Sequence, residues 1–123
     1  MTLGVRTWVI ADCWIPPAST GPEPDMTSHD TVCVLNAGDA VAQVTLTLYF
    51  TDREPVGPYE LRVPARRTHH QRFNDLADPV PVPLGTDFSC VVRSSVPVVV
   101  QQTRLDSRQA ANALLSTIAF PIS

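Results

Sequence analysis

Twelve prolines are spread along this chain of 123 residues, and their spacing excludes long helices. Proline removes a backbone donor, and its ring clashes with the preceding helical turn. The stretches between the prolines are short and rich in β-branched and aromatic residues, which favour strands. Hydrophobic residues make up 44% of the chain, enough to bury a core. The sequence therefore predicts an all-β fold.

Eight segments have the length and composition of strands. In the clearest, 41–50, Val44, Leu46 and Leu48 alternate with polar residues, so that one face packs inward. The other predicted strands are 6–11, 31–36, 59–63, 66–73, 88–95, 96–106 and a last strand that follows a brief helical turn near residues 108–115. About eight short strands without a long helix predict a β-sandwich or a jelly-roll-like barrel, formed by one domain over residues 1–123.

The cysteines indicate a reducing environment. Cys13, Cys33 and Cys90 are odd in number and match no zinc-ligand spacing, so we expect buried, reduced thiols. No secretory signal and no apolar run of about 20 residues are visible, and we expect a soluble protein of the cytoplasm.

The stretch from Arg66 to Arg72 is the most basic part of the chain, with three arginines and two histidines. Read as a strand, it is polar on both faces, so it belongs at a sheet edge, in a pocket wall or at a subunit contact. His69 and His70 are adjacent and point to opposite faces, which argues against a shared metal. We expect no metal ion and no cofactor.

Two polar islands follow apolar or basic strands. Gln101, Arg104, Asp106 and Arg108 come after a run of valines, and the sequence Arg72–Phe73–Asn74–Asp75 ends the basic strand. Such strand ends suit a polar small molecule such as a sugar, with Trp8 or Trp14 as a stacking surface. The alternative is that these groups cap strands and form ion pairs between subunits.

Familiar catalytic signatures are missing from the sequence. It has no G-x-S-x-G elbow and no glycine-rich phosphate loop, so we expect no enzyme activity. A sugar hydrolase or isomerase that uses His29, His70 and Asp106 is a weaker hypothesis without support from spacing.

Long segments resemble the sensory rhodopsin transducer family. They are TVCVLNAGD, DREPVGPY, VPARRT, RFNDL and VPVVVQQTRLDSRQAANALLSTIAF, with IPP, GPEP and SHD in the early loop. The resemblance covers residues 6 to 120. It implies a compact β-sandwich that assembles into a cytoplasmic homotetramer and acts as the partner of a membrane sensory rhodopsin, or as a sensor of a small polar ligand.

The resemblance, together with the polar islands, gives a set of candidate residues for binding a ligand or a partner. They are His29, Asp30, Asn36, Arg66, Arg67, Arg72, Asn74, Asp75, Gln101, Arg104, Asp106 and Arg108. The leading hypothesis is a non-catalytic signalling module in which Arg72, Asn74, Gln101, Arg104 and Asp106 form one pocket or contact face.

A DNA-associated regulator is the alternative hypothesis. It would use Arg62, Arg66, Arg67 and Arg72, repeated around a ring of subunits, as a local basic surface. The formal charge of −3 argues against it, because affinity for polyanions normally needs a net basic face.

Overall fold

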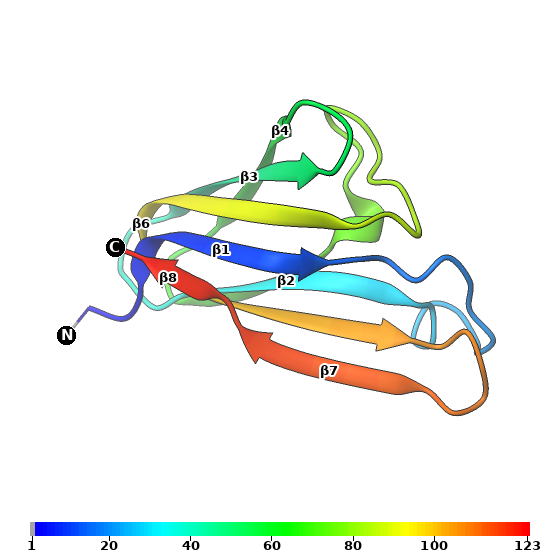
Figure 1. The fold of residues 1–123 in the computed structure, drawn as a ribbon. Helices are drawn as coiled ribbons and strands as arrows, with labels where there is room; N and C mark the ends of the chain where they lie inside the picture. Colours follow the sequence, from blue (N-terminus) through cyan, green and yellow to red (C-terminus); the bar gives the residue numbers. More distant parts are fainter. Residues whose placement is uncertain (1) are drawn as a thin grey trace.

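The structure, a computed structural model, describes residues 2–123, and most of them lie in strands (Figure 1). The strands are β1 (Val5–Cys13), β2 (His29–Asn36), β3 (Ala42–Phe50), β4 (Val56–Val63), β5 (Arg67–Arg72), β6 (Phe88–Asp106), β7 (Ala113–Ile118) and β8 (Phe120–Ile122). Within the described residues, the one helical element is a single 3-10 turn, η1 (Phe73–Asp75). The all-β prediction is confirmed.

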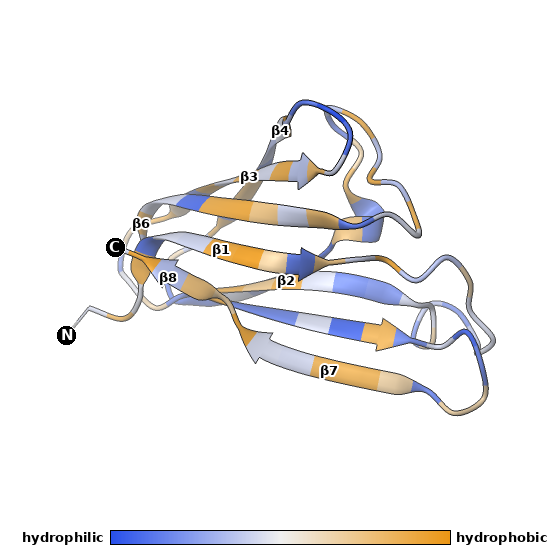
Figure 2. Cartoon of the chain, viewed as in Figure 1, coloured by the Kyte–Doolittle hydropathy of each residue, from blue (hydrophilic) through white to orange (hydrophobic). Residues whose placement is uncertain are grey.

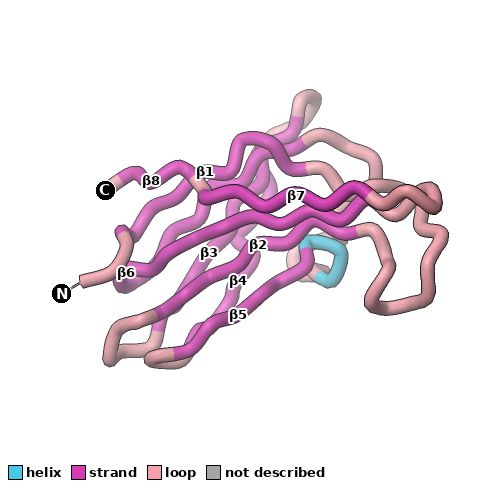
Figure 3. Tube along the Cα trace, turned by 90° about the horizontal axis from the view of Figure 1, so that it is seen from below, coloured by secondary structure: helices cyan, strands magenta, loops and turns pink. Residues whose placement is uncertain are grey.

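The strands form two antiparallel layers that share β6. The first half of β6 pairs with β1 and β3, and the second half pairs with β2 and β7. The first layer therefore runs β4-β3-β6-β1-β8, and the second runs β5-β2-β6-β7 (Figure 3). The layers enclose the core, so the molecule is a small β-sandwich.

Alternating side chains build this core, as expected for strands with one solvated face. Val44, Leu46 and Leu48 of β3 are buried, which confirms the inward face predicted for segment 41–50. In the second layer, Val32 and Val34 of β2 are also buried in this core.

Residues 88–106 form one strand rather than the two that the sequence analysis predicts. Pro97 suggested a break because it has no N–H for a ladder. In the structure it lies where β6 changes partners: pairing with β3 ends at Ser94, and pairing with β2 begins at Val99. The missing donor is therefore tolerated, and the strand continues.

The predicted helical turn near residues 108–115 is wrong. The Asp106 side chain accepts a hydrogen bond from the backbone N–H of Arg108 (3.1 Å), which closes a tight turn. The chain then returns along β6 as β7, which begins at Ala113. The count of eight strands is still correct, because the predicted last strand is divided into β7 and β8.

The last two strands carry an unusual amount of exposed apolar surface. Hydrophobic residues recur along β7 and β8 (Figure 2), and both strands lie at the edges of their layers. We call the exposed large side chains of this segment the C-terminal apolar edge: Leu114, Leu115, Ile118, Phe120 and Ile122. Ile118 and Phe120 are 60% and 69% exposed, so nothing in the described chain covers them.

The basic segment also lies at an edge. Among the described strands, β5 pairs with β2 alone, which confirms that a strand polar on both faces does not enter the middle of a layer. All three cysteines are free, as expected; Cys13 and Cys90 are buried, whereas Cys33 is half-buried. No helix in residues 2–123 is long and apolar enough to span a membrane.

Candidate functional site

A buried carboxylate, Asp30, lies at the start of β2, in the strand rather than in the loop where the sequence analysis placed it. Its side chain is fully buried and accepts hydrogen bonds from three groups. The donors are the backbone N–H of Trp14 (2.8 Å), the Gln102 side-chain amide (3.0 Å to Oδ1) and the Arg104 guanidinium (3.1 Å to Oδ2). Asp30 and Arg104 are direct cross-strand partners on β2 and β6. The register of two strands therefore builds this ion pair.

The electrostatics of Asp30 reflect two opposing effects. Burial raises the pKa of its carboxyl above the ordinary value, while the Trp14 N–H, Gln102 and Arg104 act in the other direction. The Arg104 side chain is 13% exposed and also donates to the backbone carbonyl of Asp12 (3.0 Å). Arg104 thus joins the buried carboxylate to the rim of the molecule.

The rim beside Arg104 contains a hollow of about 240 Å³, which we call the Trp14 hollow. Its lining residues are Trp14, Arg104, Asp106, Ala113, Leu114 and Leu115. The guanidinium carbon of Arg108 lies 4.9 Å from the centre of the Trp14 ring, within the range of a cation–π contact. Arg108 also pairs with Asp106 through side-chain hydrogen bonds of 2.9, 3.1 and 2.7 Å. These bonds lower the pKa of Asp106, which keeps its carboxylate charged.

The two tryptophans have different roles. Trp8 is 5% exposed, and its indole N–H donates to the carbonyls of Val5 and Val98 (3.1 and 2.9 Å). The suggestion that Trp8 offers a stacking surface is therefore wrong, because its ring fills the core. Trp14, in contrast, lines the Trp14 hollow.

A second hollow, of about 290 Å³, lies on the outer face of the second layer, and we call it the Thr31 hollow. It is lined by His29, Thr31, Cys33, His70, Arg72 and Thr103. Thr31 is the neighbour of Asp30 along β2, and successive side chains of a strand point to opposite faces. The Trp14 hollow and the Thr31 hollow are therefore separate.

This separation corrects the prediction of one pocket. Arg104 and Asp106 line the Trp14 hollow, whereas Arg72 lines the Thr31 hollow. Gln101 is exposed on β6, where its amide donates to the Ser116 hydroxyl (2.7 Å). Asn74 donates to the backbone carbonyl of Ser28 (3.0 Å) and lines neither hollow. The alternation of β6 explains the split, since Gln101 and Arg104 lie on opposite faces.

The candidates at the far end of β2 are structural. Asn36 is fully buried and donates to the carbonyls of Ala40, Val63 and Pro64, which holds two connections together. Arg66 takes a positive φ of 55° in the connection before β5, and its guanidinium pairs with Asp39 (2.6 Å).

The two remaining candidates, Arg67 and Asp75, are exposed. Arg67 bonds the carbonyl of its neighbour Arg66 (2.9 Å), and Asp75 ends η1. Neither lines the Trp14 hollow or the Thr31 hollow.

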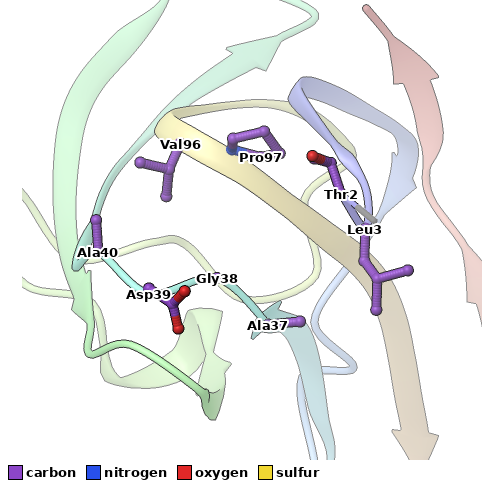
Figure 4. Close-up of a pocket in the computed structure, with 8 residues that line it drawn as sticks. All are labelled: Thr2, Leu3, Ala37, Gly38, Asp39, Ala40, Val96 and Pro97. Atoms are coloured by element: carbon purple, nitrogen blue, oxygen red, sulfur yellow. The ribbon is translucent and has the colours of Figure 1, made fainter.

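A larger hollow, of about 350 Å³, lies at the same far end (Figure 4). It is lined by Thr2, Leu3, Ala37, Gly38, Asp39, Ala40, Val96 and Pro97. Asp39 is its one charged side chain and is already paired with Arg66. Size alone therefore does not identify the functional site.

Residues outside the candidate set hold the early loop against the end of β6. The backbone N–H of Ser107 donates to the Ser28 hydroxyl (2.9 Å), and its carbonyl accepts from the Thr20 N–H (2.7 Å). Gln102 supports Asp30 and also donates to the carbonyl of Asp12 (2.6 Å). Gln102 could have been found, since it is a polar residue at an inward position of an apolar strand; the serines give no comparable signal.

Neither metal binding nor the proposed sugar chemistry gains support from the geometry. The described residues contain no group of three or more His, Cys, Asp or Glu side chains suited to a metal. His29 and His70 line the Thr31 hollow, but Asp106 lines the Trp14 hollow. The three residues suggested for a hydrolase or isomerase are therefore not brought together.

Comparisons with known proteins agree on the family. The family model described as Anabaena sensory rhodopsin transducer matches residues 3–121. A solved structure titled Anabaena sensory rhodopsin transducer is 58% identical, covers 84% of this chain and 99% of its own, and has a TM-score of 0.76. Another, from Thermotoga maritima and titled Thermotoga maritima 1070, is 31% identical with coverage of 97% and 96% and a TM-score of 0.84. The search of curated proteins gives no match. The chain belongs to the sensory rhodopsin transducer family.

Proposed function

We propose that this chain is a non-catalytic signalling module, one domain over its whole length, that binds a small, polar, sugar-like ligand in the Trp14 hollow. The observation that carries the proposal is the convergence of an aromatic ring, a guanidinium and a charged carboxylate on that hollow. Sugar rings present apolar C–H faces and hydroxyl edges, so they suit an aromatic face beside groups that donate and accept hydrogen bonds.

The dimensions of the hollow favour a small ligand. Pockets for drug-sized molecules usually enclose roughly 300–1,000 Å³, whereas the Trp14 hollow encloses about 240 Å³. A monosaccharide or a similar metabolite fits this space better than a nucleotide or an oligosaccharide.

Arg104 provides the link from the ligand to the fold. Its guanidinium lines the hollow and bonds the buried Asp30 at the same time. A ligand that reorients Arg104 changes the balance between its bonds to Asp30 and to Asp12, which lie on different strands. A ligand shifts an equilibrium between two states only if it binds one of them more tightly. A ligand that prefers one arrangement of Arg104 would therefore favour the conformational or assembly state that contains this arrangement.

A thermal-shift screen of monosaccharides and polyols tests the proposal, since a ligand that binds only the native state raises its stability. Calorimetric titration of the best ligand then compares Asp106→Asn with Asp52→Asn. Both substitutions remove a carboxylate paired with a nearby arginine, but Asp106 is half-buried beside the hollow, whereas Asp52 is exposed in the β3–β4 turn. We expect Asp106→Asn to weaken binding by about tenfold and Asp52→Asn to leave it unchanged. Equal ligand affinity in both variants would show that the ligand does not bind in the Trp14 hollow.

A membrane sensory rhodopsin is the proposed protein partner. This follows from the family and from the 58% identical relative that is named as a transducer of such a receptor. The test is to immobilise the purified receptor on a sensor surface and to measure the binding of this chain in the dark and under illumination. Identical signals from the receptor and from an unrelated membrane protein would contradict it.

We also propose that the chain forms a homo-oligomer, with the tetramer implied by the family. The C-terminal apolar edge supports association, because exposed edge strands with apolar side chains pair readily with other chains. Sedimentation should show a larger species than the monomer for the native chain and a smaller one for Phe120→Asp. A native chain that sediments as a monomer at working concentration would overturn this.

We place the protein in the cytoplasm, and the three free cysteines support a reducing compartment.

The DNA-binding alternative gains little support, since Arg66 is paired with Asp39 and Arg72 bonds the carbonyl of Pro24. Binding to duplex DNA with a steep salt dependence would revive it.

A further inference from the structure

The outer face of the second layer carries a row of polar side chains across its four strands. Thr31 of β2 lies opposite both Arg72 of β5 and Thr103 of β6, and Thr103 lies opposite Ser116 of β7. We call Arg72 and the three hydroxyl residues Thr31, Thr103 and Ser116 the polar row. Figure 3 shows these four strands side by side. Directly opposite residues on one face have Cβ atoms about 5 Å apart, so one small molecule can reach several of them.

The hollow over this row has a one-sided charge. Arg72 is cationic and two histidines stand beside it, while no carboxylate is among the six lining residues. This is unusual in a chain with twelve acidic residues and a formal charge of −3. Burial raises the pKa of the Cys33 thiol, so that this side chain stays neutral in the hollow. The electrostatic character of the hollow therefore favours an anion.

Thr31 gives a second and independent indication. The residue is 6% exposed, yet its hydroxyl has no hydrogen-bond partner in the described part of the protein. Asn74 Oδ1 is the one fully enclosed side-chain polar atom without a partner in residues 2–123, so the Thr31 hydroxyl keeps contact with the hollow. A hydroxyl that faces the hollow without a protein partner is free to bond a ligand there in place of water.

Two side chains around Thr31 are held in place by backbone carbonyls. One guanidinium N–H of Arg72 bonds the carbonyl of Pro24 (3.1 Å), which anchors the side chain and leaves its other donors available. The Nδ1 of His29 bonds the carbonyl of Thr27 (2.9 Å). Because a carbonyl only accepts, Nδ1 carries the proton and donates it to Thr27, which fixes the ring orientation and leaves Arg72 as the charged donor of the hollow.

From these observations we infer that the Thr31 hollow is a binding site for a tetrahedral oxyanion, either free phosphate or the phosphate group of a small metabolite. Arg72 supplies charge and planar donors, for which phosphate oxygens are good acceptors. Thr31 donates its hydroxyl to one of the remaining oxygens. The Thr103 hydroxyl lies 3.2 Å from that of Ser116 and donates to another oxygen when Ser116 is the donor within that pair. The site is separate from the Trp14 hollow and stands or falls independently of the sugar-like ligand proposed there.

Calorimetric titration with inorganic phosphate, at constant ionic strength, tests this site. Arg72→Gln should weaken binding by about tenfold or more, whereas Arg62→Gln, which removes the same charge from an exposed position on β4, should not. Thr31→Val keeps the shape of the side chain and should weaken binding by about threefold to tenfold, with Thr45→Val on β3 as its control.

Two further arms identify the source of the anion. Glycerol 3-phosphate that binds more tightly than phosphate assigns the site to a phosphorylated metabolite, and equal or weaker binding assigns it to free phosphate. Glycerol alone should not bind. In amide NMR spectra, phosphate should move the resonances of Thr31 and Thr103 and leave that of Trp14 unchanged.

Several results would overturn the inference. They are no saturable phosphate binding, equal losses in Arg72→Gln and Arg62→Gln, or resonance changes centred on Trp14. Salt-steep binding of duplex DNA without binding of phosphate would also overturn it, because it would assign the charge to a diffuse contact with a polyanion.

Discussion

Removing the guanidinium of Arg104 should leave Asp30 as a buried carboxylate without its cation. Asp30 is fully buried, whereas the Arg104 side chain is 13% exposed. Removing one member of a buried ion pair typically costs 3–5 kcal/mol. Since the Trp14 N–H and the Gln102 amide remain as donors, we expect the lower end, about 3 kcal/mol, for Arg104→Met. The bond from Arg104 to the exposed Asp12 side chain adds little.

A double-mutant cycle with Asp30→Asn measures the pair itself. Urea unfolding, followed by tryptophan fluorescence at one protein concentration, gives the free energy of unfolding of each variant. We expect the double variant to be more stable than the sum of the single losses predicts, by at least about 1.5 kcal/mol. Losses that add within about 0.5 kcal/mol would refute the reasoning, because the two side chains would then not stabilise each other.

We also expect the free energy of unfolding of the native chain to depend on pH through Asp30. Burial raises the pKa of Asp30 in the folded chain, so the folded state binds this proton more tightly than the unfolded state. The contribution of Asp30 to stability is therefore fully present below the unfolded pKa, near 4, and falls as the pH rises through the folded pKa. Relative to Asp30→Asn, the native chain should lose stability over this interval, and Arg104→Met should lose more. A flat difference across the interval would contradict the stated cause.

Three further predictions concern other parts of the fold. Asn36→Ala should lower the free energy of unfolding by about 2 kcal/mol because three backbone carbonyls lose their donor, whereas the exposed Asn112→Ala should have no measurable effect in the same urea titration. Ser107→Ala should accelerate protease cleavage within residues 15–28, because its hydroxyl bonds the Met26 carbonyl and stands 3.1 Å from the Ser28 hydroxyl; an unchanged cleavage rate would show that backbone bonds suffice. Iodoacetamide should label Cys33 first in the native protein, since burial raises the thiol pKa of Cys13 and Cys90 most strongly; intact-mass analysis should show all three labelled after denaturation.

Local patterns of the sequence predict much of the fold. Alternation is a property of neighbouring residues, so the inward face of segment 41–50 is visible without tertiary information. The edge position of β5 is one of the three placements that its two polar faces predict. The continuity of β6 through Pro97 could not be predicted. It depends on the neighbouring strands, because β3 pairs with β6 before Pro97 and β2 pairs with it after Pro97.

The site is harder to predict, because it depends on register between distant segments. Asp30 and Arg104 are 74 residues apart, and only the pairing of β2 with β6 brings them into contact. The same register places Gln101 and Arg104 on opposite faces, so residues close in sequence do not share a pocket. For the tryptophans, composition marks both rings as candidates, and packing decides that Trp8 is enclosed and Trp14 faces a hollow.

The indole N–H resonances of the two tryptophans test the central claim most directly. Trp14 lines the proposed ligand site, whereas the indole of Trp8 bonds the carbonyl of Val98 in the core and serves as an internal control. The sugar-like ligand with the largest thermal shift is titrated into ¹⁵N-labelled protein. We predict a saturable shift of the Trp14 indole resonance and an unchanged Trp8 indole resonance. Saturable binding that leaves the Trp14 resonance in place would contradict it.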